Sequence, residues 1–341
     1  MTGVPREPLT SSSAIVPGRT DPAPETFLVG DVGGTNCRLS LASASGGRLR
    51  LDRPKRYKCA DFADAQAAIA HYLGSVGWSA PLGAAVIAVA GPVNDGVVQS
   101  TNMRWRMSEA QLRDQGARKV KLVNDYTALA LAVDHLGEDD VIPIGPPALL
   151  QVHDTVAVVG AGTGFGVGAV ARGIGGSAVI ATEGGHISFA PVDDIEVAIL
   201  RILTQRYGRV SIERLLSGPG LVNLRAALAQ IEGARLDPIA SEDIVRAAEE
   251  GDGLSERALE RFCAIYGSVA GDIALVYGAR GGVFLGGGIA PAIARRLQAS
   301  AFRARFEAKG RFQAYLSAIP TCIIANTHAA LLGAASLASA M

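Results

Sequence analysis

The pattern of apolar and polar positions in residues 27–136 predicts strands separated by short helices. Residues 27–32 are almost continuously apolar, which indicates a buried strand. The Gly33-Gly34 pair predicts a tight turn, after which residues 37–42 return as the second strand of a hairpin. Further strands are expected at 48–58, 84–90 and 120–123, and helices at 61–76, after Ser108 and at 126–136.

A second cycle of the same kind begins near residue 155. Residues 155–160 predict a strand, 161–168 a glycine-rich turn, and the chain from Val170 a return strand. The later elements are expected as helices across 193–278 broken by a turn at 217–220, a strand at 283–285, a helix after Gly288, a strand at 321–325 and an Ala-rich terminal helix. Because strand, glycine turn and strand occur twice, the pattern predicts two related α/β domains around a cleft.

Composition narrows the class of protein. The chain has 341 residues, which favours two domains over one core. Lys+Arg and Asp+Glu both number 32, and a net charge of zero argues against nucleic acid as the main partner. The 41 glycines and 5% aromatic residues are typical of phosphate-binding α/β enzymes, which need tight turns and close backbone approaches.

Cysteine spacing and the N-terminal stretch indicate the compartment. The four cysteines lie far apart with no CxxC pair, so we expect reduced thiols rather than zinc ligands or disulfides. No apolar run approaches the ~20 residues that a membrane span requires. Residues 1–26 hold five prolines and no apolar signal core, so we expect a disordered extension and a cytoplasmic protein.

The first hairpin turn carries a candidate phosphate loop. Its members are Gly30, Asp31, Val32, Gly33, Gly34 and Thr35. Adjacent glycines let backbone N–H groups approach an anion, and the threonine adds a hydroxyl donor. The Asp31 carboxylate could hold a hydrated Mg²⁺. The alternative is a hairpin turn that binds nothing.

Two further glycine-rich turns follow later strands. The first contains Gly160, Gly162, Thr163 and Gly164, and the second contains Gly286, Gly287 and Gly288. Neither has GxGxxG spacing, and no lysine in the chain directly follows a glycine, so a dinucleotide fingerprint and a Walker A loop are both absent. A purely structural turn remains the alternative for each, although two such turns one domain length apart favour phosphate binding.

Several polar residues lie where a neutral polyol could be held. Asn124 and Asp125 end a predicted strand, which is where ligand-facing residues gather in open α/β sheets. Glu183 and His186 share one glycine-containing loop, and Glu213 lies at a predicted helix start. Sugar hydroxyls need paired donors and acceptors, which these side chains supply. The alternatives are a helix N-cap for Asp125, solvated loop residues for Glu183 and His186, and a helix-dipole contact for Glu213.

These segments, in order and at matching spacing, resemble the bacterial glucokinases. The specific motifs are Glu-Gly-Gly-His-Ile-Ser-Phe-Ala-Pro from Glu183, Leu-Ser-Gly-Pro-Gly-Leu-Val-Asn-Leu from Leu216 and Phe-Glu-Ala-Lys-Gly-Arg-Phe from Phe306. The resemblance runs from Phe27 to the C-terminus. It implies a two-domain actin-like ATPase (ribonuclease H-like) fold with an inter-domain cleft. The implied parts are a small α/β domain at 27–136, a large α/β domain at 137–325, and a C-terminal helix at 326–341 packing back on the small domain.

The resemblance also implies an activity and residue roles. It implies phosphorylation of the 6-hydroxyl of glucose by ATP with Mg²⁺, and a homodimer. The three glycine-rich segments then bind ATP, Asp31 holds Mg²⁺ through water, and Asp125 is the general base. The implied glucose ligands are Asn102, Asn124, Asp125, Glu183, His186 and Glu213.

One departure from the related repressor/kinase branch is informative. That branch carries a cysteine-rich zinc motif after its Glu-x-Gly-His, whereas Asp193-Asp194 and an acidic helix follow here, so zinc is not expected. A kinase for another hexose stays open, because a pocket's hydroxyl preference depends on fine geometry. A sugar-responsive transcription regulator would need a DNA-reading domain, and residues 1–26 are too short and Pro-rich for one. An actin-like filament or chaperone ATPase would not need the polyol-binding set.

Deleting residues 1–26 should leave folding and activity nearly unchanged, because a segment with five prolines and few large apolar residues does not support a packed core. The melting temperature and activity of the truncated chain measure this. An insoluble truncated protein, or one melting several degrees lower, would mean that the segment docks on the body.

Overall fold

The computed structural model describes residues 25–99, 105–146, 153–174 and 176–341. The N-terminal half forms a five-stranded sheet in the order β3-β2-β1-β4-β8. Its strands are β1 (Thr26–Val32), β2 (Asn36–Ser45), β3 (Arg48–Lys58), β4 (Leu82–Val89) and β8 (Ala117–Asn124). β1 pairs antiparallel with β2 and parallel with β4, and β4 pairs parallel with β8. The predicted hairpin of β1 and β2 is therefore confirmed, and β4 and β8 continue the sheet parallel to β1.

The second sheet repeats this plan. It has six strands in the order β12-β11-β10-β13-β14-β9. They are β9 (Val141–Pro143), β10 (Val156–Ala161), β11 (Phe165–Gly173), β12 (Gly176–Ala181), β13 (Gly282–Gly286) and β14 (Thr321–Ile324). β10 is antiparallel to β11 and parallel to β13, as β1 is to β2 and β4, so the predicted internal repeat is confirmed. A small third sheet comprises β5 (Val93–Asn94), β6 (Val97–Val98) and β7 (Met107–Ser108).

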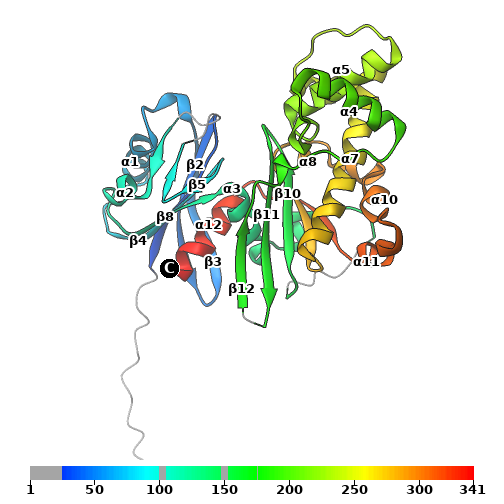
Figure 1. Cartoon of the computed structure of the whole chain (residues 1–341). Coiled ribbons are helices and arrows are strands. Elements are labelled where there is room, and N and C mark those ends of the chain that lie inside the picture. Colours follow the sequence, from blue (N-terminus) through cyan, green and yellow to red (C-terminus); the bar gives the residue numbers. More distant parts are fainter. Residues whose placement is uncertain (1–24, 100–104, 147–152, 175) are drawn as a thin grey trace, which may run out of the picture.

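Helices form three layers around the two sheets (Figure 1). α1 (Ala65–Ser75) and α2 (Glu109–Arg113) cover the outer face of the first sheet. α3 (Asp125–Ala132) and α12 (Ala329–Ala340) lie between the sheets. The outer face of the second sheet carries α4 (Asp194–Tyr207), α5 (Gly218–Glu232), α6 (Ser241–Glu249), α7 (Gly253–Tyr277), α8 (Ile289–Ala292), α9 (Ala294–Ala299), α10 (Phe302–Glu307) and α11 (Gln313–Ser317). The short 3-10 turns are η1 (Cys59–Asp61), η2 (Val133–His135), η3 (Glu138–Asp140), η4 (Gly184–His186), η5 (Ile212–Arg214) and η6 (Gly310–Phe312).

Alternation along β1 explains the layering of the first sheet. Leu28 packs in the cluster that contains α1, whereas Phe27 and Val29 pack in the cluster that contains α12. Successive strand residues point to opposite faces, so an apolar run of this kind is buried on both sides. The C-terminal helix thereby packs against the first sheet, whose strands come from the start of the chain.

The structure corrects three predicted boundaries, two of them set by helix caps. The helix expected at 61–76 begins only at Ala65, because the Asp64 carboxylate accepts the Ala67 N–H at 2.8 Å. The turn expected at 217–220 is instead the start of α5, where Ser217 Oγ accepts the Gly220 N–H at 3.0 Å and proline is tolerated in the first turn. The return strand expected from Val170 begins earlier, at Phe165, so the glycine-rich turn is confined to residues 162–164.

Three further details concern the cysteines, the start of α2 and the apolar character of the helices. All four cysteines lie in the described part of the chain, buried and outside any disulfide bond. Ser108 caps α2 by accepting the Gln111 N–H at 3.3 Å, as its spacing predicts. Among the described residues, no helix is both long and apolar enough to cross a membrane.

The two helices between the sheets approach each other through one glycine. A Cβ added at Gly333 of α12 would lie 1.7 Å from the carbonyl oxygen of Ala128 in α3, so no side chain fits there. Gly74 of α1 is also helical, but a Cβ added at Gly74 meets no atom within 4 Å. The exposed Gly74 therefore has room for a methyl group, and the buried Gly333 has none.

Gly333→Ala should lower the melting temperature by several degrees, because overpacking of a close helix contact costs ~1–3 kcal/mol. Gly74→Ala is the matched control and should keep or slightly raise it, since alanine loses less backbone entropy than glycine in a helix. Thermal unfolding of both variants measures the difference. Equal melting temperatures would mean that α3 and α12 separate easily.

Candidate active site at the carboxyl ends of the strands

The predicted site residues gather at one edge of each sheet. β1 and β8 flank β4, with Val32 and Asn124 both adjacent to Val89 at its carboxyl end. In the second sheet, Gly160 of β10 pairs with Gly286 of β13, again just before the strands end. Ligands of open α/β sheets bind at this edge, and the sequence prediction of the general location agrees with it.

The first glycine turn is short and exposed. Gly33 N–H donates to the Asn36 carbonyl at 2.9 Å, which closes the turn and leaves Gly34 and Thr35 exposed. Cys59, the first residue of η1 directly after β3, supports it by donating its N–H to the Thr35 carbonyl at 2.8 Å. Gly30, by contrast, lies inside β1, where an added Cβ would be 2.7 Å from Ile87 Cδ1. Its glycine therefore serves packing of the sheet, and the backbone donors available to an anion are those of the turn.

Asp31 has a partner that the sequence reasoning missed. Arg38 stands opposite Asp31 across the hairpin, and its Nη1 donates to Asp31 Oδ2 at 2.8 Å. Burial raises the pKa of Asp31, and the Arg38 charge opposes that rise. Within the described residues, Asp31 Oδ1 makes no hydrogen bond. The signal was available, because a hairpin closed at Gly33-Gly34 places residues 31 and 38 side by side.

The junction of β8 and α3 separates the roles of two neighbouring residues. Asn124 is the N-cap of α3, since its Oδ1 accepts the N–H groups of Tyr126 at 2.9 Å and Thr127 at 3.3 Å. Its Nδ2 donates to the Gly91 carbonyl at 3.3 Å, so the Asn124 side chain has a structural task besides its predicted contact with sugar. Asp125 is the first residue of α3, which excludes the alternative that it is the cap.

Asp125 is a strongly perturbed carboxyl group of the site. Burial, the negative charge of Asp31 and that of Glu183 raise its pKa from the ordinary 3.8 to about 7, against the lowering effect of the Tyr126 N–H bond. Asp125 Oδ1 accepts that N–H at 3.0 Å. Carboxylates from the first hairpin, from α3 and from the loop before η4 therefore act on one another. A group with a pKa near 7 is suited to general-base catalysis at neutral pH.

Glu183 and His186 lie on an exposed loop held against β11. Their side chains are 55% and 58% exposed, with His186 Nε2 at 3.9 Å from Glu183 Oε2. A Cβ added at Gly185 would lie 1.9 Å from the Phe165 carbonyl oxygen, so this glycine lets the loop lie on the strand. The two side chains are thereby free to contact a ligand while their backbone is fixed.

Glu213 joins this loop to the second glycine turn. Ser188 and Ser211 form a β-bridge, which brings η5 beside η4. Glu213 Oε2 accepts the Phe165 N–H at 2.9 Å, directly after the turn at 162–164. The carboxylate therefore binds a distant backbone donor, and the helix-dipole alternative does not account for its position. This supporting role for Glu213 was not predicted.

The second and third glycine turns pack on each other. Gly162 N–H donates to the Gly164 carbonyl at 2.8 Å, and Thr163 between them is exposed. Gly287 has φ 79°, and a Cβ there would lie 2.4 Å from the Ala161 carbonyl oxygen, so both backbone shape and close approach require glycine. Gly288 faces open space. These turns form one continuous backbone surface beside Asp125's helix.

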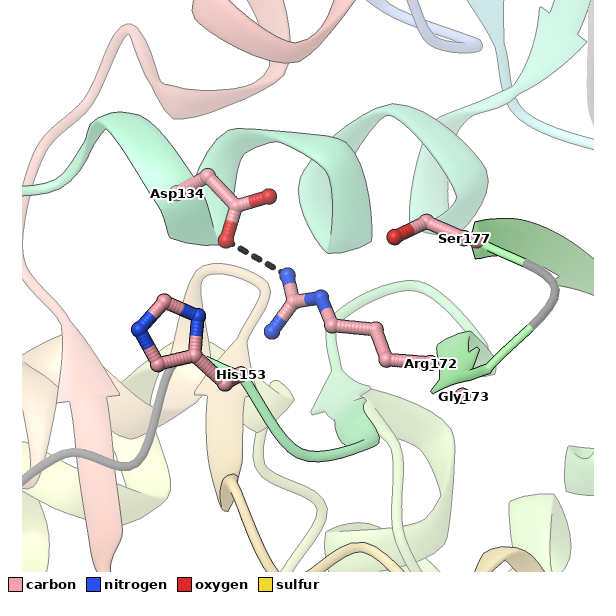
Figure 2. Close-up of a pocket in the computed structure, with 6 residues that line it drawn as sticks. Asp134, His153, Arg172, Gly173 and Ser177 are labelled. Atoms are coloured by element: carbon pink, nitrogen blue, oxygen red, sulfur yellow. Dashed lines mark hydrogen bonds and ion pairs between the residues drawn. The ribbon is translucent and has the colours of Figure 1, made fainter.

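Two features lie outside this constellation. Asn102, a predicted sugar ligand, falls outside the described residues. A pocket of about 480 Å³ is lined by Asp134, Arg172 and His153 at the opposite end of β10 and β11, and none of the predicted site residues lines it (Figure 2). Within the described part of the chain, no group of three or more His, Cys, Asp or Glu side chains is placed to bind a metal.

Comparison with known proteins places the chain in a family. The family model described as Glucokinase matches residues 28–341. A glucokinase of Caulobacter sp. (strain K31) is 50% identical over 309 residues, which are 90% of this chain and 93% of that protein.

Solved structures agree. The crystal structure of a glucokinase from an Antarctic psychrotroph has a TM-score of 0.85 and 34% identity, covering 93% of this chain and 99% of that one. A ROK family glucokinase from Streptomyces griseus, solved with glucose and AMPPNP, has a TM-score of 0.62 and 21% identity over 94% of this chain and all of that one, which shows the shared fold. The two repeated sheets are those of the actin-like ATPase fold. The chain therefore belongs to the glucokinase family and is an enzyme of the sugar-kinase class that phosphorylates glucose.

Proposed function

We propose that this enzyme transfers the γ-phosphoryl group of ATP to the 6-hydroxyl of D-glucose, with Asp125 as the general base. The observation that carries the proposal is the Asp125 carboxyl group, which has its pKa raised to about 7 beside Asp31 and Glu183. Phosphoryl transfer depends mainly on positioning and charge stabilisation, and a base at the attacking hydroxyl adds ~10²–10⁴ in rate. Asp125 accepts that proton as the hydroxyl attacks the γ-phosphorus and the bond to ADP breaks.

The two glycine turns would hold the phosphates from the two sheets. Their exposed members, Gly34 and Thr35 in one and Thr163 in the other, present backbone N–H groups and hydroxyls at the carboxyl edge. Gly287 and Gly288 would lie against the adenosine, where Gly288 leaves open space. The Streptomyces griseus relative, crystallised with glucose and AMPPNP, supports ATP as the donor.

Mg²⁺ fits the charge of the site. Asp31 Oδ1 makes no hydrogen bond within the described residues, and the Asp31 charge contributes to the raised pKa of Asp125, so the site has an excess of negative charge. Asp31 would hold the ion through water. A bound Mg²⁺ supplies neutralisation of phosphate charge.

Glu183, His186, Glu213 and the Asn124 amide would orient the pyranose. The first two are exposed and close together, and Glu213 is fixed by its bond to Phe165 N–H.

Another hexose on the same scaffold is the second candidate. A coupled ADP-release assay with glucose, mannose, fructose and N-acetylglucosamine tests the choice, and a higher kcat/KM for another sugar would overturn glucose. A homodimer, as the resemblance implies, is checked by sedimentation.

Asp125→Asn should lower kcat by roughly 10²–10⁴ while glucose binds within about tenfold of wild type, because the base acts only in the transition state. Glu183→Gln is the comparison and should mainly raise the KM for glucose, since it weakens ground-state and transition-state binding alike. Steady-state kinetics and glucose titration measure both. If Asp125→Asn kept more than about a tenth of kcat, Asp125 would not be the base.

Asp125→Asn should also stabilise the protein at alkaline pH. The native state holds the Asp125 proton more tightly than the unfolded chain, so its contribution to stability is fully present below pH 3.8, falls as pH rises towards 7 and stays low above it. Asparagine does not titrate. The variant should therefore melt a few degrees above wild type at pH 8, with a smaller gain at pH 5. A gain independent of pH would contradict the raised pKa.

A further inference from the structure

Tyr126, the residue after the proposed base, is seated on glycines of the other sheet. A Cβ added at Gly166 of β11 would lie 1.9 Å from the Tyr126 ring carbons Cδ2 and Cε2. One added at Gly168 would lie 2.5 Å from the Tyr126 carbonyl oxygen, and one at Gly160 would lie 2.5 Å from its hydroxyl oxygen. Gly160 and Gly166 are direct partners across β10 and β11, so these glycines form one flat seat.

The seat explains why the glycine-rich segment continues past its turn. Gly166 and Gly168 belong to β11 and lie outside the turn at 162–164. Residues two apart on a strand share a face, and on this face a side chain at either position would collide with Tyr126. The glycines therefore hold α3 close to the second sheet, although α3 continues directly from β8 of the first.

One residue thereby contacts both halves of the site. The Tyr126 hydroxyl donates to the Gly160 carbonyl at 2.8 Å, in the strand that leads into the second glycine turn. Its backbone N–H donates to Asp125 Oδ1 at 3.0 Å and is shared with Asn124 Oδ1 at 2.9 Å. The ring and hydroxyl fix Tyr126 on β10 and β11, and the N–H fixes the Asp125 carboxylate on Tyr126.

The rest of this helix is held on both sides. Gly333 of α12 touches Ala128, and at the far end Asp134 pairs with Arg172 of β11 (Figure 2). The Tyr126 hydroxyl bonds to the strand that leads into the second glycine turn, and Tyr126 directly follows the proposed base.

We propose that Tyr126 is a positioning residue that fixes the Asp125 carboxylate relative to the second phosphate turn, and so sets the distance between the attacking hydroxyl and the γ-phosphoryl group. The proposal rests on Asp125 as the base. A carboxylate misplaced by a fraction of an ångström still binds glucose but loses rate, so the effect belongs in kcat.

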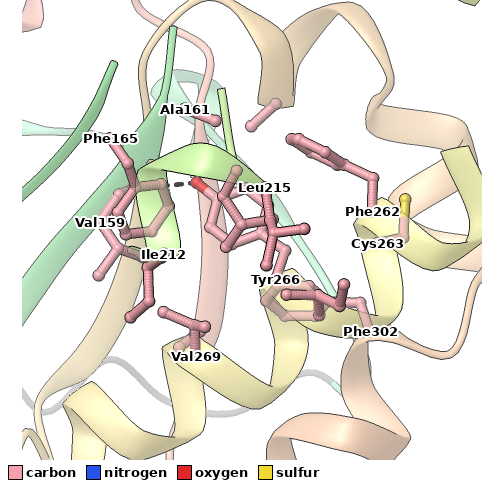
Figure 3. Packing of buried hydrophobic residues seen from close by; sticks show 14 of the residues in the cluster. Val159, Ala161, Phe165, Ile212, Leu215, Phe262, Cys263, Tyr266, Val269 and Phe302 are labelled. Carbon is pink, nitrogen blue, oxygen red and sulfur yellow. Dashed lines mark hydrogen bonds between the residues drawn. The ribbon is translucent and has the colours of Figure 1, made fainter. Parts of the chain in front are cut away.

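The test removes one hydroxyl group. Tyr126→Phe keeps the ring on its glycine seat and deletes the bond to Gly160. Tyr266→Phe is the matched control, because the Tyr266 hydroxyl is also buried and donates to the adjacent carbonyl of the same strand, Val159, at 3.2 Å (Figure 3). Both variants should lose a similar amount of stability, seen as a similar small drop in melting temperature.

Tyr126→Phe should lower kcat roughly tenfold, with the KM for glucose and for ATP within about twofold of wild type. Tyr266→Phe should keep more than about half of kcat. If Tyr126→Phe stays within about twofold of wild type in kcat, or if both variants lose kcat equally, the proposal is wrong. Asp125→Asn is assayed beside them to separate failure of the general-base proposal from failure of the Tyr126 proposal. An active Asp125→Asn would mean that Asp125 is not the base, and Tyr126 would then have no base to position.

A second pair of variants tests the seat from the other strand. Gly166→Ala should displace the ring and lower kcat more than Tyr126→Phe does, again with little change in either KM. Gly173→Ala lies on the same strand, where an added Cβ meets no atom within 4 Å, and should keep wild-type kcat. Wild-type kcat in folded Gly166→Ala would overturn the proposal, whatever Tyr126→Phe does.

Discussion

The close contact of α3 with both sheets is the constraint on which the site depends. α3 continues directly from β8, yet Tyr126 lies against Gly160 and Gly166 of the second sheet, and Ala128 lies against Gly333 of α12. Contacts at these distances admit no Cβ, so α3 has little freedom to move relative to either neighbour. Asp125 begins this helix and thus takes its position from both sheets at once.

Electrostatics then sets the character of the site. Asp31 and Glu183 come from two other segments, and their negative charges, together with burial, raise the pKa of Asp125. Arg38 offsets part of this charge by pairing with Asp31, and it leaves Asp125 without a cationic partner within the described residues. A buried carboxyl group with a raised pKa and no cationic partner lowers the stability of the fold but is suited to proton transfer. Catalytic sites commonly trade stability for activity in this way.

The glycines serve two different purposes that look alike in the sequence. Those at 33–34 and 162–164 form exposed turns with backbone donors. Gly166, Gly168 and Gly185 instead allow backbone or a ring to pack where a side chain would collide. Glycine-rich segments in this fold therefore serve close packing as well as the proposed phosphate binding. The two uses lie next to each other in residues 162–168.

The sequence by itself determined the local elements and the family. Periodicity placed both hairpins and the repeated order of strands, because alternation and turn chemistry are properties of neighbouring residues. The motifs identified the glucokinase resemblance and located Asp125 at a strand end. The tertiary structure decided the long-range contacts: the Phe165 N–H donates to Glu213, and Tyr126 lies on Gly166 and bonds Gly160. Glu213 and Phe165 are 48 positions apart in the chain, and Tyr126 and Gly160 are 34 positions apart. No local pattern encodes such contacts, so the roles of the glycines and of Tyr126 appear only once the two sheets have come together around α3.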